Sequence, residues 1–375
     1  MNTVFGIRID FTKSHGSYVF DKNTNNQFLD MFCMFSSLPL GYNHPIFDDS
    51  FDEKVKHISR LRMCNNLFES DELIEFTASL KEIGSHKNIH FCSTGALAVE
   101  SALKCAFEFK KDPTALVLGI KNSYHGINGW GYMTDPEISS VKNRVLHYPK
   151  NHWEHHTIDD LMNCITDNDD IAAVIVEPIQ CTAGDIYLDQ EKLRKLQVLC
   201  NNNDVCFIVD EVQTGFGSTG EMWYSDKIGL HPDILIFGKK SQICGIMVND
   251  KYAEAIKSQY RKLQVTFDGD LLDVVRAQYI LKAIQEYDLM GAVEANSVIF
   301  EKELSPLFLN YRSSGHLIAF DFEDQKERDY FVSRAYENNL LVNPTNDRSV
   351  RLRPNMAITH SEMDTFFEKI ARVIK

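Results

Sequence analysis

Four short apolar runs, separated by stretches with helical spacing, constrain the fold of this chain more than any other feature. They lie between about residues 89 and 237 and comprise residues 116–119, 172–176, 205–209 and 234–237. Uninterrupted apolar strands that alternate with helices are typical of a largely parallel sheet covered on both faces. Ligands collect at the carboxyl ends of the strands in such sheets. The pattern therefore predicts an α/β domain with a site at that edge.

Charged residues follow three of these runs. Glu177, Asp210 and Lys239 stand at the carboxyl ends of the predicted strands. A buried carboxylate and a buried amine are both costly unless something pairs with them. Pyridoxal phosphate can pair with both, because a carboxylate holds the proton on its pyridine nitrogen and its aldehyde forms a Schiff base with lysine. Acidic strand ends and solvated Gly-Lys-Lys turns are also common, so spacing alone leaves both interpretations open.

The composition is that of an ordinary globular protein. The 375 residues, 44% hydrophobic and 25% charged, suffice for one large domain and a smaller one. A net charge of −14 disfavours nucleic-acid binding over the surface as a whole. Residues 1–13 lack the apolar core of a signal peptide, and no apolar run reaches the length of a membrane span. Nine cysteines without paired metal spacing suit a reducing cytoplasm. We therefore expect a cytoplasmic protein that binds no nucleic acid, membrane or metal.

Residues 95–111 are predicted to form a helix whose start suits a phosphate. Small residues recur every four positions along it, which gives a face suited to close packing on a sheet. Its start at Thr94 and Gly95 offers backbone donors and the positive end of a helix dipole. Most such starts are only caps.

Motifs in a fixed order resemble those of one known family. They comprise residues 28–32 with 40–45, then 93–100, 124–126, 177–180, 208–247, 266–267 and 350–354. Over most of its length the chain is similar to the class III aminotransferases, the ω-aminotransferase group of fold-type I pyridoxal phosphate enzymes. Within that group, residues 239–245 look most like those of the lysine 6-aminotransferases. Several motifs in order are far more specific than any one of them.

The resemblance implies a mostly parallel sheet of the seven-stranded type in a large pyridoxal phosphate-binding domain, plus a smaller α+β domain. We expect the large domain at residues 50–285 and the small one at residues 1–49 and 286–375. The pattern itself changes after about residue 285 to a shorter α+β series. Helices are predicted near residues 291–304, 325–338 and 360–375, and strands near residues 316–322 and 340–342.

The resemblance assigns the catalytic pair. It implies that Lys239, directly after Gly238, carries the cofactor as a Schiff base and then moves the substrate proton. Asp210 would keep the pyridine nitrogen protonated so that the ring accepts electrons. Lys240 is the alternative lysine, and side chains alternate between faces along an extended chain, so only one of the two can point into the site.

Other residues match the cofactor contacts of the family. Gly95 and Ala96 would donate backbone hydrogen bonds to the phosphate, Tyr124 would stack on the ring, and Gln213 would lie near its phenolic oxygen. His125 is expected to be structural.

Thr266 matches a threonine that reaches the phosphate from the neighbouring subunit, which implies a homodimer with shared active sites. The family usually continues with Gly-Gly-Asn, whereas this chain has Asp268, Gly269 and Asp270. Carboxylates near a phosphate repel it unless they point away. Either the loop is rearranged or the cofactor is held less tightly.

Four positions match substrate contacts of the family. Arg351 would clamp the carboxylate of 2-oxoglutarate or glutamate, and Glu177 would pair with this arginine when the other substrate is bound. A surface ion pair is the commoner fate of such an arginine. In the lysine 6-aminotransferase branch an arginine follows the Tyr-His-Gly triplet and an asparagine precedes the threonine. This chain has Ile127 and Gln264 there.

These residues imply a ping-pong transfer of an amino group from a primary ω-amine, lysine-like, to 2-oxoglutarate. An isomerase or decarboxylase of the same fold is one alternative. A degenerate cofactor-binding homologue without transaminase activity is the other, because of the departures at Asp268 and Asp270.

Overall fold

The computed structural model describes residues 5–63, 68–112, 114–127, 153–259 and 262–375. The chain forms two compact units. The smaller unit comprises Met1–Glu53, Gly217–Gly220 and Tyr279–Lys375, and the larger unit comprises Lys54–Phe216 and Glu221–Gln278. The domain boundaries expected from the sequence, at residues 50 and 285, stay a prediction.

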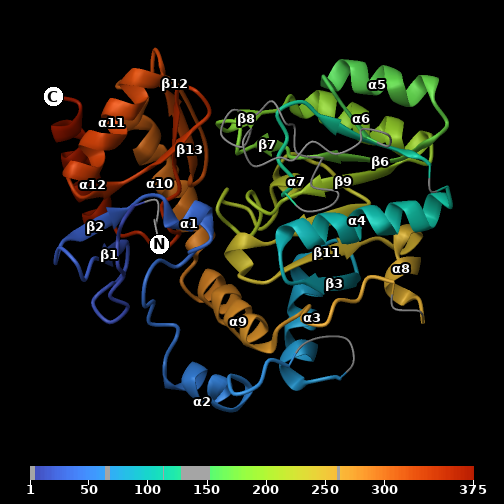
Figure 1. Cartoon of the computed structure of the whole chain (residues 1–375), viewed down its shortest axis with the longest axis horizontal. Coiled ribbons are helices and arrows are strands. Elements are labelled where there is room, and N and C mark those ends of the chain that lie inside the picture. Colours follow the sequence, from blue (N-terminus) through green and yellow to red (C-terminus); the bar gives the residue numbers. More distant parts are fainter. Residues whose placement is uncertain (1–4, 64–67, 113, 128–152, 260–261) are drawn as a thin grey trace. The chain divides into compact units, whose positions relative to one another are not determined.

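A seven-stranded sheet forms the centre of the larger unit (Figure 1). Its strands, in spatial order, are β3 (Asn88–Cys92), β11 (Cys244–Val248), β10 (Ile234–Phe237), β9 (Cys206–Asp210), β6 (Ile171–Val176), β4 (Leu116–Ile120) and β5 (Trp153–His156). Only β11 runs antiparallel to its two neighbours, and the other pairs are parallel. The predicted α/β fold with a mostly parallel seven-stranded sheet is therefore confirmed.

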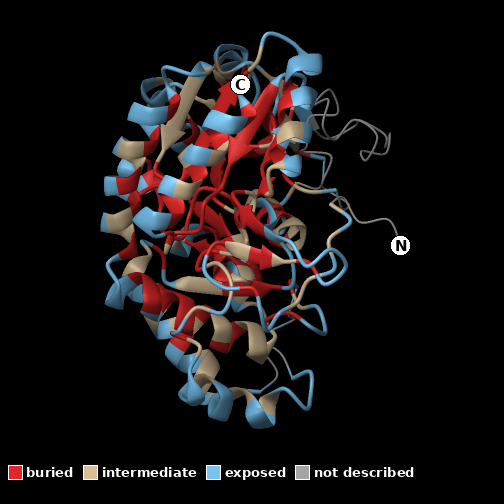
Figure 2. Cartoon of the chain, turned by 90° about the vertical axis from the view of Figure 1, so that its left-hand side faces the viewer, coloured by how far each residue is buried: buried red, intermediate tan, exposed pale blue. Residues whose placement is uncertain are grey.

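The strands form where the apolar runs predict them. Every residue of β6, β9 and β10 is buried, as expected for strands covered on both faces. Burying each Val, Ile or Leu side chain contributes roughly 1.5–3 kcal/mol. Figure 2 shows this burial concentrated on the strands, while the outward faces of the helices are exposed.

Helix α4 (Gly95–Lys110) packs across the sheet and begins shortly after the carboxyl end of β3. Its residues Ala98, Ala102 and Ala106 are fully buried, because small side chains let the helix backbone approach the strands closely. The remaining helices of this unit are α3 (Asp71–Ile83), α5 (Ile158–Asp167), α6 (Gln190–Asn202), α7 (Tyr224–Lys227) and α8 (Glu254–Lys257). Helices α2 (Asp49–Ile58) and α9 (Leu271–Glu286) cross the boundaries between the units.

The smaller unit contains two sheets. One has the order β12 (Leu309–Ser314), β13 (Leu317–Asp321), β16 (Ser349–Leu352) and β15 (Asn343–Thr345), and the other has β1 (Tyr18–Phe20), β2 (Gln27–Asp30) and β14 (Leu340–Leu341). Its helices are α1 (Cys33–Ser36), α10 (Leu289–Leu304), α11 (Gln325–Glu337) and α12 (His360–Val373). The predicted α+β series after residue 285 is confirmed.

The amino-terminal segment is joined to the end of the chain through Glu362. This residue closes the capping box of α12 with Thr359, and its other oxygen accepts a hydrogen bond from the Ser17 backbone at 2.8 Å. Strand β2 also pairs with β14. These contacts place Ser17 and β2 in the smaller unit.

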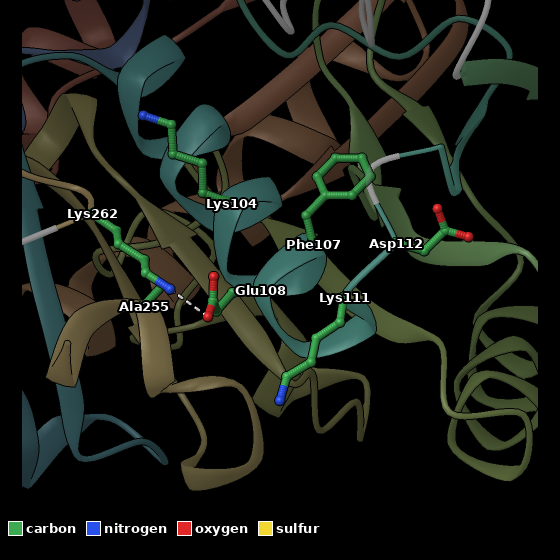
Figure 3. Close-up of a pocket in the computed structure, with 7 residues that line it drawn as sticks. All are labelled: Lys104, Phe107, Glu108, Lys111, Asp112, Ala255 and Lys262. Carbon is green, nitrogen blue, oxygen red and sulfur yellow. Dashed lines mark ion pairs between the residues drawn. The ribbon is translucent and has the colours of Figure 1, made fainter. Parts of the chain in front are cut away.

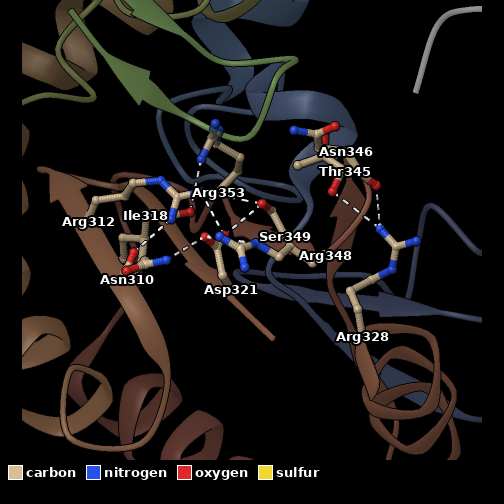
Figure 4. Close-up of polar contacts among 10 residues, drawn as sticks. All are labelled: Asn310, Arg312, Ile318, Asp321, Arg328, Thr345, Asn346, Arg348, Ser349 and Arg353. Atoms are coloured by element: carbon tan, nitrogen blue, oxygen red, sulfur yellow. Dashed lines mark hydrogen bonds and ion pairs between the residues drawn. The ribbon is translucent and has the colours of Figure 1, made fainter. Parts of the chain in front are cut away.

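A polar cluster organises the four-stranded sheet (Figure 4). Asp321 accepts hydrogen bonds from Ser349 Oγ at 2.7 Å and from Arg312 Nη2 at 2.9 Å. Burial acts to raise the pKa of Asp321, but these two partners outweigh it and hold the pKa below its usual value. None of the described helices is long and apolar enough to cross a membrane.

Candidate active site

Asp210 is the last residue of β9 and lies at the carboxyl edge of the sheet. Its Oδ1 accepts a hydrogen bond from the Val212 backbone at 3.0 Å, and its Oδ2 lies 2.8 Å from Nδ1 of His125. Both the carboxylate and the imidazole are buried. The orientation of the carboxylate is therefore set from two sides.

His125 is the residue that sequence reasoning undervalued. The resemblance treated it as structural, and the structure shows that it contacts Asp210 directly. We expect it to act through Asp210, as a positioning residue rather than a catalytic one. Its place beside Tyr124 was the only sequence signal for this role.

Glu177 directly follows β6 and is buried close to Asp210. Its Oε1 accepts a hydrogen bond from the backbone of Tyr124 at 2.6 Å. Burial, and after it the negative charge of Asp210, raises the pKa of Glu177 well above its ordinary value, while the Tyr124 hydrogen bond and the charge of Lys239 oppose this. Four of the residues predicted from sequence are thus brought into one electrostatic cluster.

The two adjacent lysines lie in a 3-10 turn, η2 (Lys239–Ser241), and not in an extended chain. The predicted alternation of side chains along an extended chain is therefore wrong for Lys239 and Lys240. The two lysine side chains nevertheless have different surroundings. Lys240 is 1% exposed, and its Nζ donates a hydrogen bond to the Gln213 carbonyl. Lys239 is only partly buried, and its charge acts on Glu177 and on the Cys244 thiol.

The backbone of Lys239 adopts a left-handed conformation with φ of 50°. This conformation costs a residue other than glycine roughly 1–2 kcal/mol. Such strain is typical of functional sites that the surrounding structure holds in place. The geometry fits Lys239 as the cofactor lysine, which stays a prediction.

The predicted phosphate-binding turn is the start of α4. Thr94 caps the helix, since its Oγ1 accepts a hydrogen bond from the Leu97 backbone at 3.2 Å. A Cβ on Gly95 would lie 3.3 Å from the side chain of Val212, and one on Gly126 would lie 2.7 Å from Ala96 Cβ. The absence of these side chains lets the helix start, the strand end after Asp210 and the loop of His125 meet closely.

The two unexpected carboxylates after Thr266 are each bonded within the chain. Asp268 is buried, and its Oδ1 accepts hydrogen bonds from the Ser93 backbone at 3.0 Å and from Ser93 Oγ at 3.1 Å. Asp270 accepts a hydrogen bond from the Leu272 backbone and pairs with Arg62 at 3.2 Å. The Asp268 carboxylate therefore ties its loop to the residue before Thr94.

The two residues before these carboxylates belong to the same loop. Thr266 is exposed on this single chain, and Gln264 is partly buried. The predicted roles of Thr266 toward a partner's cofactor and of Gln264 toward a substrate stay predictions.

Ile127 is 55% exposed at the end of the loop that carries Tyr124 and His125. The residues that follow it, 128–152, lie outside the described residues. Its apolar side chain offers no partner for a carboxylate.

Arg351 belongs to β16 in the smaller unit, whereas Lys239 belongs to the larger unit. It is buried, and its Nη2 lies 2.8 Å from the Asn343 amide oxygen in the amide orientation that satisfies both ends of that side chain. The neighbouring Arg353 donates a hydrogen bond to the carbonyl of Leu352. It donates another to the carbonyl of Ile318 (Figure 4). Arg351 is therefore not a surface ion pair, and its role as a carboxylate clamp stays a prediction.

A surface pocket of about 390 Å³ lies along the carboxyl-terminal half of α4 (Figure 3). Lys262 and Glu108 form an ion pair of 2.5 Å at its wall. At 1.5 Å per residue, Glu108 lies about 20 Å along the helix from Gly95. This pocket is separate from the Lys239 cluster.

A parallel sheet that delivers a lysine and a histidine-held aspartate to one edge, beside a helix start suited to a phosphate, defines a fold-type I pyridoxal phosphate enzyme. The chain belongs to the class III aminotransferases, because the family model described as "Aminotransferase class-III" matches residues 2–374. It is therefore a transaminase that uses pyridoxal phosphate, as the sequence predicted.

Relatives agree with this assignment over the full length. L-lysine-epsilon aminotransferase from Amycolatopsis lactamdurans is 28% identical and is aligned over 98% of this chain and 92% of its own. Acetylornithine aminotransferase from Archaeoglobus fulgidus is 29% identical, over 96% of this chain and 94% of its own. The structure of lysine aminotransferase from M. tuberculosis in the internal aldimine form matches with a TM-score of 0.92 at 27% identity, covering 99% of this chain and 96% of that one.

Proposed function

We propose that this aminotransferase moves an amino group from a primary ω-amine donor to 2-oxoglutarate in a ping-pong reaction. One observation carries the proposal. Lys239 lies in the same electrostatic cluster as the buried Asp210 and Glu177, while the neighbouring Lys240 is bonded to the Gln213 carbonyl. The strand ends thus supply one lysine and one fixed carboxylate to the same site.

Asp210 would hold the proton on the pyridine nitrogen. When bound, pyridoxal phosphate supplies an electron-accepting ring next to the substrate amine. Asp210 can serve it only if the carboxylate stays ionised and correctly aimed, and the contacts with His125 and Val212 provide that orientation.

Lys239 would move a proton to and from the reacting carbon of the substrate. A general base must lie within hydrogen-bond reach of the proton that it takes, and it works best when nearby charges tune its pKa. The charge of Lys239 acts on Glu177, as does that of Asp210. Tyr124, whose backbone is fixed by Glu177, would provide the flat contact for the ring.

Glu177 would let one site accept two different substrates. The keto acid brings a carboxylate for Arg351, and the amine donor does not need that clamp. When the amine donor is bound, Glu177 would pair with Arg351 and neutralise its charge. When the keto acid is bound, Glu177 would release Arg351, and the guanidinium would be available for the substrate carboxylate. The raised pKa of Glu177 supports this role, because burial disfavours its charged form and a nearby guanidinium would favour it.

The donor is proposed to be lysine-like at its reacting end. Relatives named for lysine support this choice. The exposed Ile127, however, cannot bind a substrate carboxylate. We therefore propose that the donor is an ω-amine without a carboxylate at that end, or one held through another part of a larger molecule.

A half-reaction screen tests the donor. Purified enzyme is mixed with lysine, ornithine, 4-aminobutyrate or neutral diamines, and conversion of the cofactor to its aminated form is followed by absorbance. We expect a neutral diamine to react faster than lysine, and 2-oxoglutarate to restore the original spectrum. Faster reaction with lysine than with every other amine would show that its carboxylate is held elsewhere. Failure of 2-oxoglutarate to restore the spectrum would contradict the proposed acceptor.

Aminotransfer is favoured over the alternatives. An isomerase or decarboxylase would not release an aminated cofactor, so it would form no glutamate from 2-oxoglutarate. A degenerate homologue would have no need of the fixed Asp210 and the strained Lys239 together. Assembly as a homodimer through Thr266 and a cytoplasmic location belong to the same proposal.

A further inference from the structure

Three potential metal ligands meet beside the phosphate-binding turn. His90 and Cys92 lie two residues apart on β3, so their side chains share one face of the strand. Asp268 comes from the loop before α9. One ligand atom of each residue lies within 4.8 Å of the other two, and the three residues are 5%, 1% and 1% exposed.

His90 gives an independent indication that a ligand binds in this cluster. Its buried Nε2 has no hydrogen-bond partner among the described residues, although it lies 3.8 Å from Asp268 Oδ2. Unpartnered buried polar atoms are rare and call for an explanation. The ring also hydrogen-bonds the Leu263 carbonyl. With the ring proton on Nδ1, the Nε2 lone pair would be available to a metal ion in the cluster.

Each of the three side chains is also oriented by an outer partner. The Leu263 carbonyl holds the His90 ring, Ser93 holds Oδ1 of Asp268 and leaves Oδ2 toward the histidine, and Ser101 Oγ lies 3.5 Å from the Cys92 sulfur. Outer contacts of this kind fix the ring tautomer and orient the ligands in protein metal sites.

We propose that His90, Cys92 and Asp268 bind one divalent transition-metal cation of the Zn²⁺ type, with a fourth position open to water. Imidazole, thiolate and carboxylate are the ligands that Zn²⁺ takes, at about 2.0–2.3 Å. Ligands of one tetrahedral ion are roughly 3.3–3.8 Å apart at such bond lengths. The cluster therefore needs only a small contraction.

Charge around the site is compatible with a cation. The Asp268 carboxylate and a thiolate on Cys92 together balance a divalent ion. Lys104 on α4 is close enough to act on His90 and opposes binding, so both negative ligands are needed. The bound ion would link β3, immediately before Ser93 and Thr94, to the loop that carries Thr266.

The test is metal binding by the holoenzyme. The protein is treated with a chelator and dialysed, Zn²⁺ affinity is measured by competition with a chromophoric chelator, and metal content is measured by mass spectrometry. Co²⁺ then replaces Zn²⁺, and its absorption in the red is read where the cofactor does not absorb. We expect one ion per chain, a spectrum of tetrahedral Co²⁺ with a thiolate ligand, and affinities at least about tenfold weaker for Cys92→Ser and for Asp268→Asn.

Cys200→Ser is the matched control, because Cys200 is equally buried but lies on α6, outside the cluster. It should bind the ion like the wild type. Equal affinity of the wild type and Asp268→Asn, or a Co²⁺ spectrum without the tetrahedral and thiolate bands, would overturn the proposal. If Cys92→Ser does not fold, Asp268→Asn decides, since it keeps the shape of the side chain. The readout does not use aminotransfer, so it is independent of the donor and acceptor.

Discussion

His125 Nδ1 lies 2.8 Å from Asp210 Oδ2, although the two residues are 85 positions apart in the chain. The loop after β4 supplies the histidine, and the end of β9 supplies the carboxylate. The other carboxylate oxygen is occupied by the Val212 backbone. The group proposed to hold the pyridine proton is therefore oriented by the fold itself.

This contact predicts that His125→Gln lowers turnover by about 10- to 100-fold while the cofactor stays bound. Hydrogen bonds to charged groups are worth roughly 1.5–3 kcal/mol. Steady-state kinetics over a range of pH measures the effect, and a shift of the pH profile would separate positioning from a mere loss of stability. His86→Gln is the control, because His86 is also buried but bonds the Pro232 carbonyl. Equal loss in both variants would remove the special role of His125.

The two lysines of η2 should respond differently to substitution. Lys239→Ala should lose the covalently held cofactor and its yellow colour. Lys240→Ala should keep the colour but lose roughly 1–3 kcal/mol of unfolding free energy, because the buried Gln213 carbonyl loses its partner. Borohydride reduction followed by peptide mapping locates the cofactor. A label on Lys240 would mean that the assignment is reversed.

The raised pKa of Glu177 predicts how stability depends on pH. The folded protein keeps a proton on Glu177 that the unfolded chain releases above its ordinary pKa of 4.5. The stabilisation is complete below pH 4.5 and is lost as pH rises through the higher folded pKa. As pH rises from 4.5, the free energy of unfolding should therefore decrease less in Glu177→Gln than in the wild type.

Urea unfolding at several pH values measures this difference. Glu254→Gln is the control, because Glu254 is exposed on α8. A parallel decline in the wild type and Glu177→Gln would contradict the raised pKa.

The proposed sharing of active sites between two subunits predicts that assembly and cofactor binding are coupled. We expect a homodimer in sedimentation experiments and release of cofactor when it dissociates. Thr266→Ala should weaken cofactor binding about tenfold without changing the dimer, since one hydrogen bond to a charged phosphate is lost. Val265→Ala, at the neighbouring exposed position, should change neither. Firm cofactor binding by a monomer would refute the coupling.

Ile127→Arg should make lysine a better donor. A guanidinium at this position would bind the substrate carboxylate, and hydrogen bonds to charged groups are worth roughly 1.5–3 kcal/mol. We expect at least a tenfold lower KM for lysine and no gain for a neutral diamine. Ile127→Gln is the control, because it introduces a polar side chain without a positive charge. An unchanged KM for lysine in the arginine variant would show that its carboxylate does not reach this loop.

The sequence by itself determined four of the seven strands of the central sheet and the helix from Gly95. The strands around residues 172–176 and 234–237 and the helix from Gly95 were predicted within one or two residues, because continuous apolar runs and small-residue spacing are local patterns. Strands β3, β5 and β11 were not predicted. His90 interrupts the apolar run of β3, and β11 begins directly after a turn and contains Gly245.

The tertiary structure decided the contacts among those residues. The alternation of side chains in a strand does not apply to the 3-10 turn of Lys239. No local sequence pattern shows that Lys240 contacts Gln213, or that Asp268 accepts a hydrogen bond from Ser93, 175 positions away. The cluster of His90, Cys92 and Asp268 was hidden for the same reason, and so the sequence predicted no metal site. Such contacts depend on which strands become neighbours and on how closely glycine and alanine let their loops approach, and only the folded chain sets both.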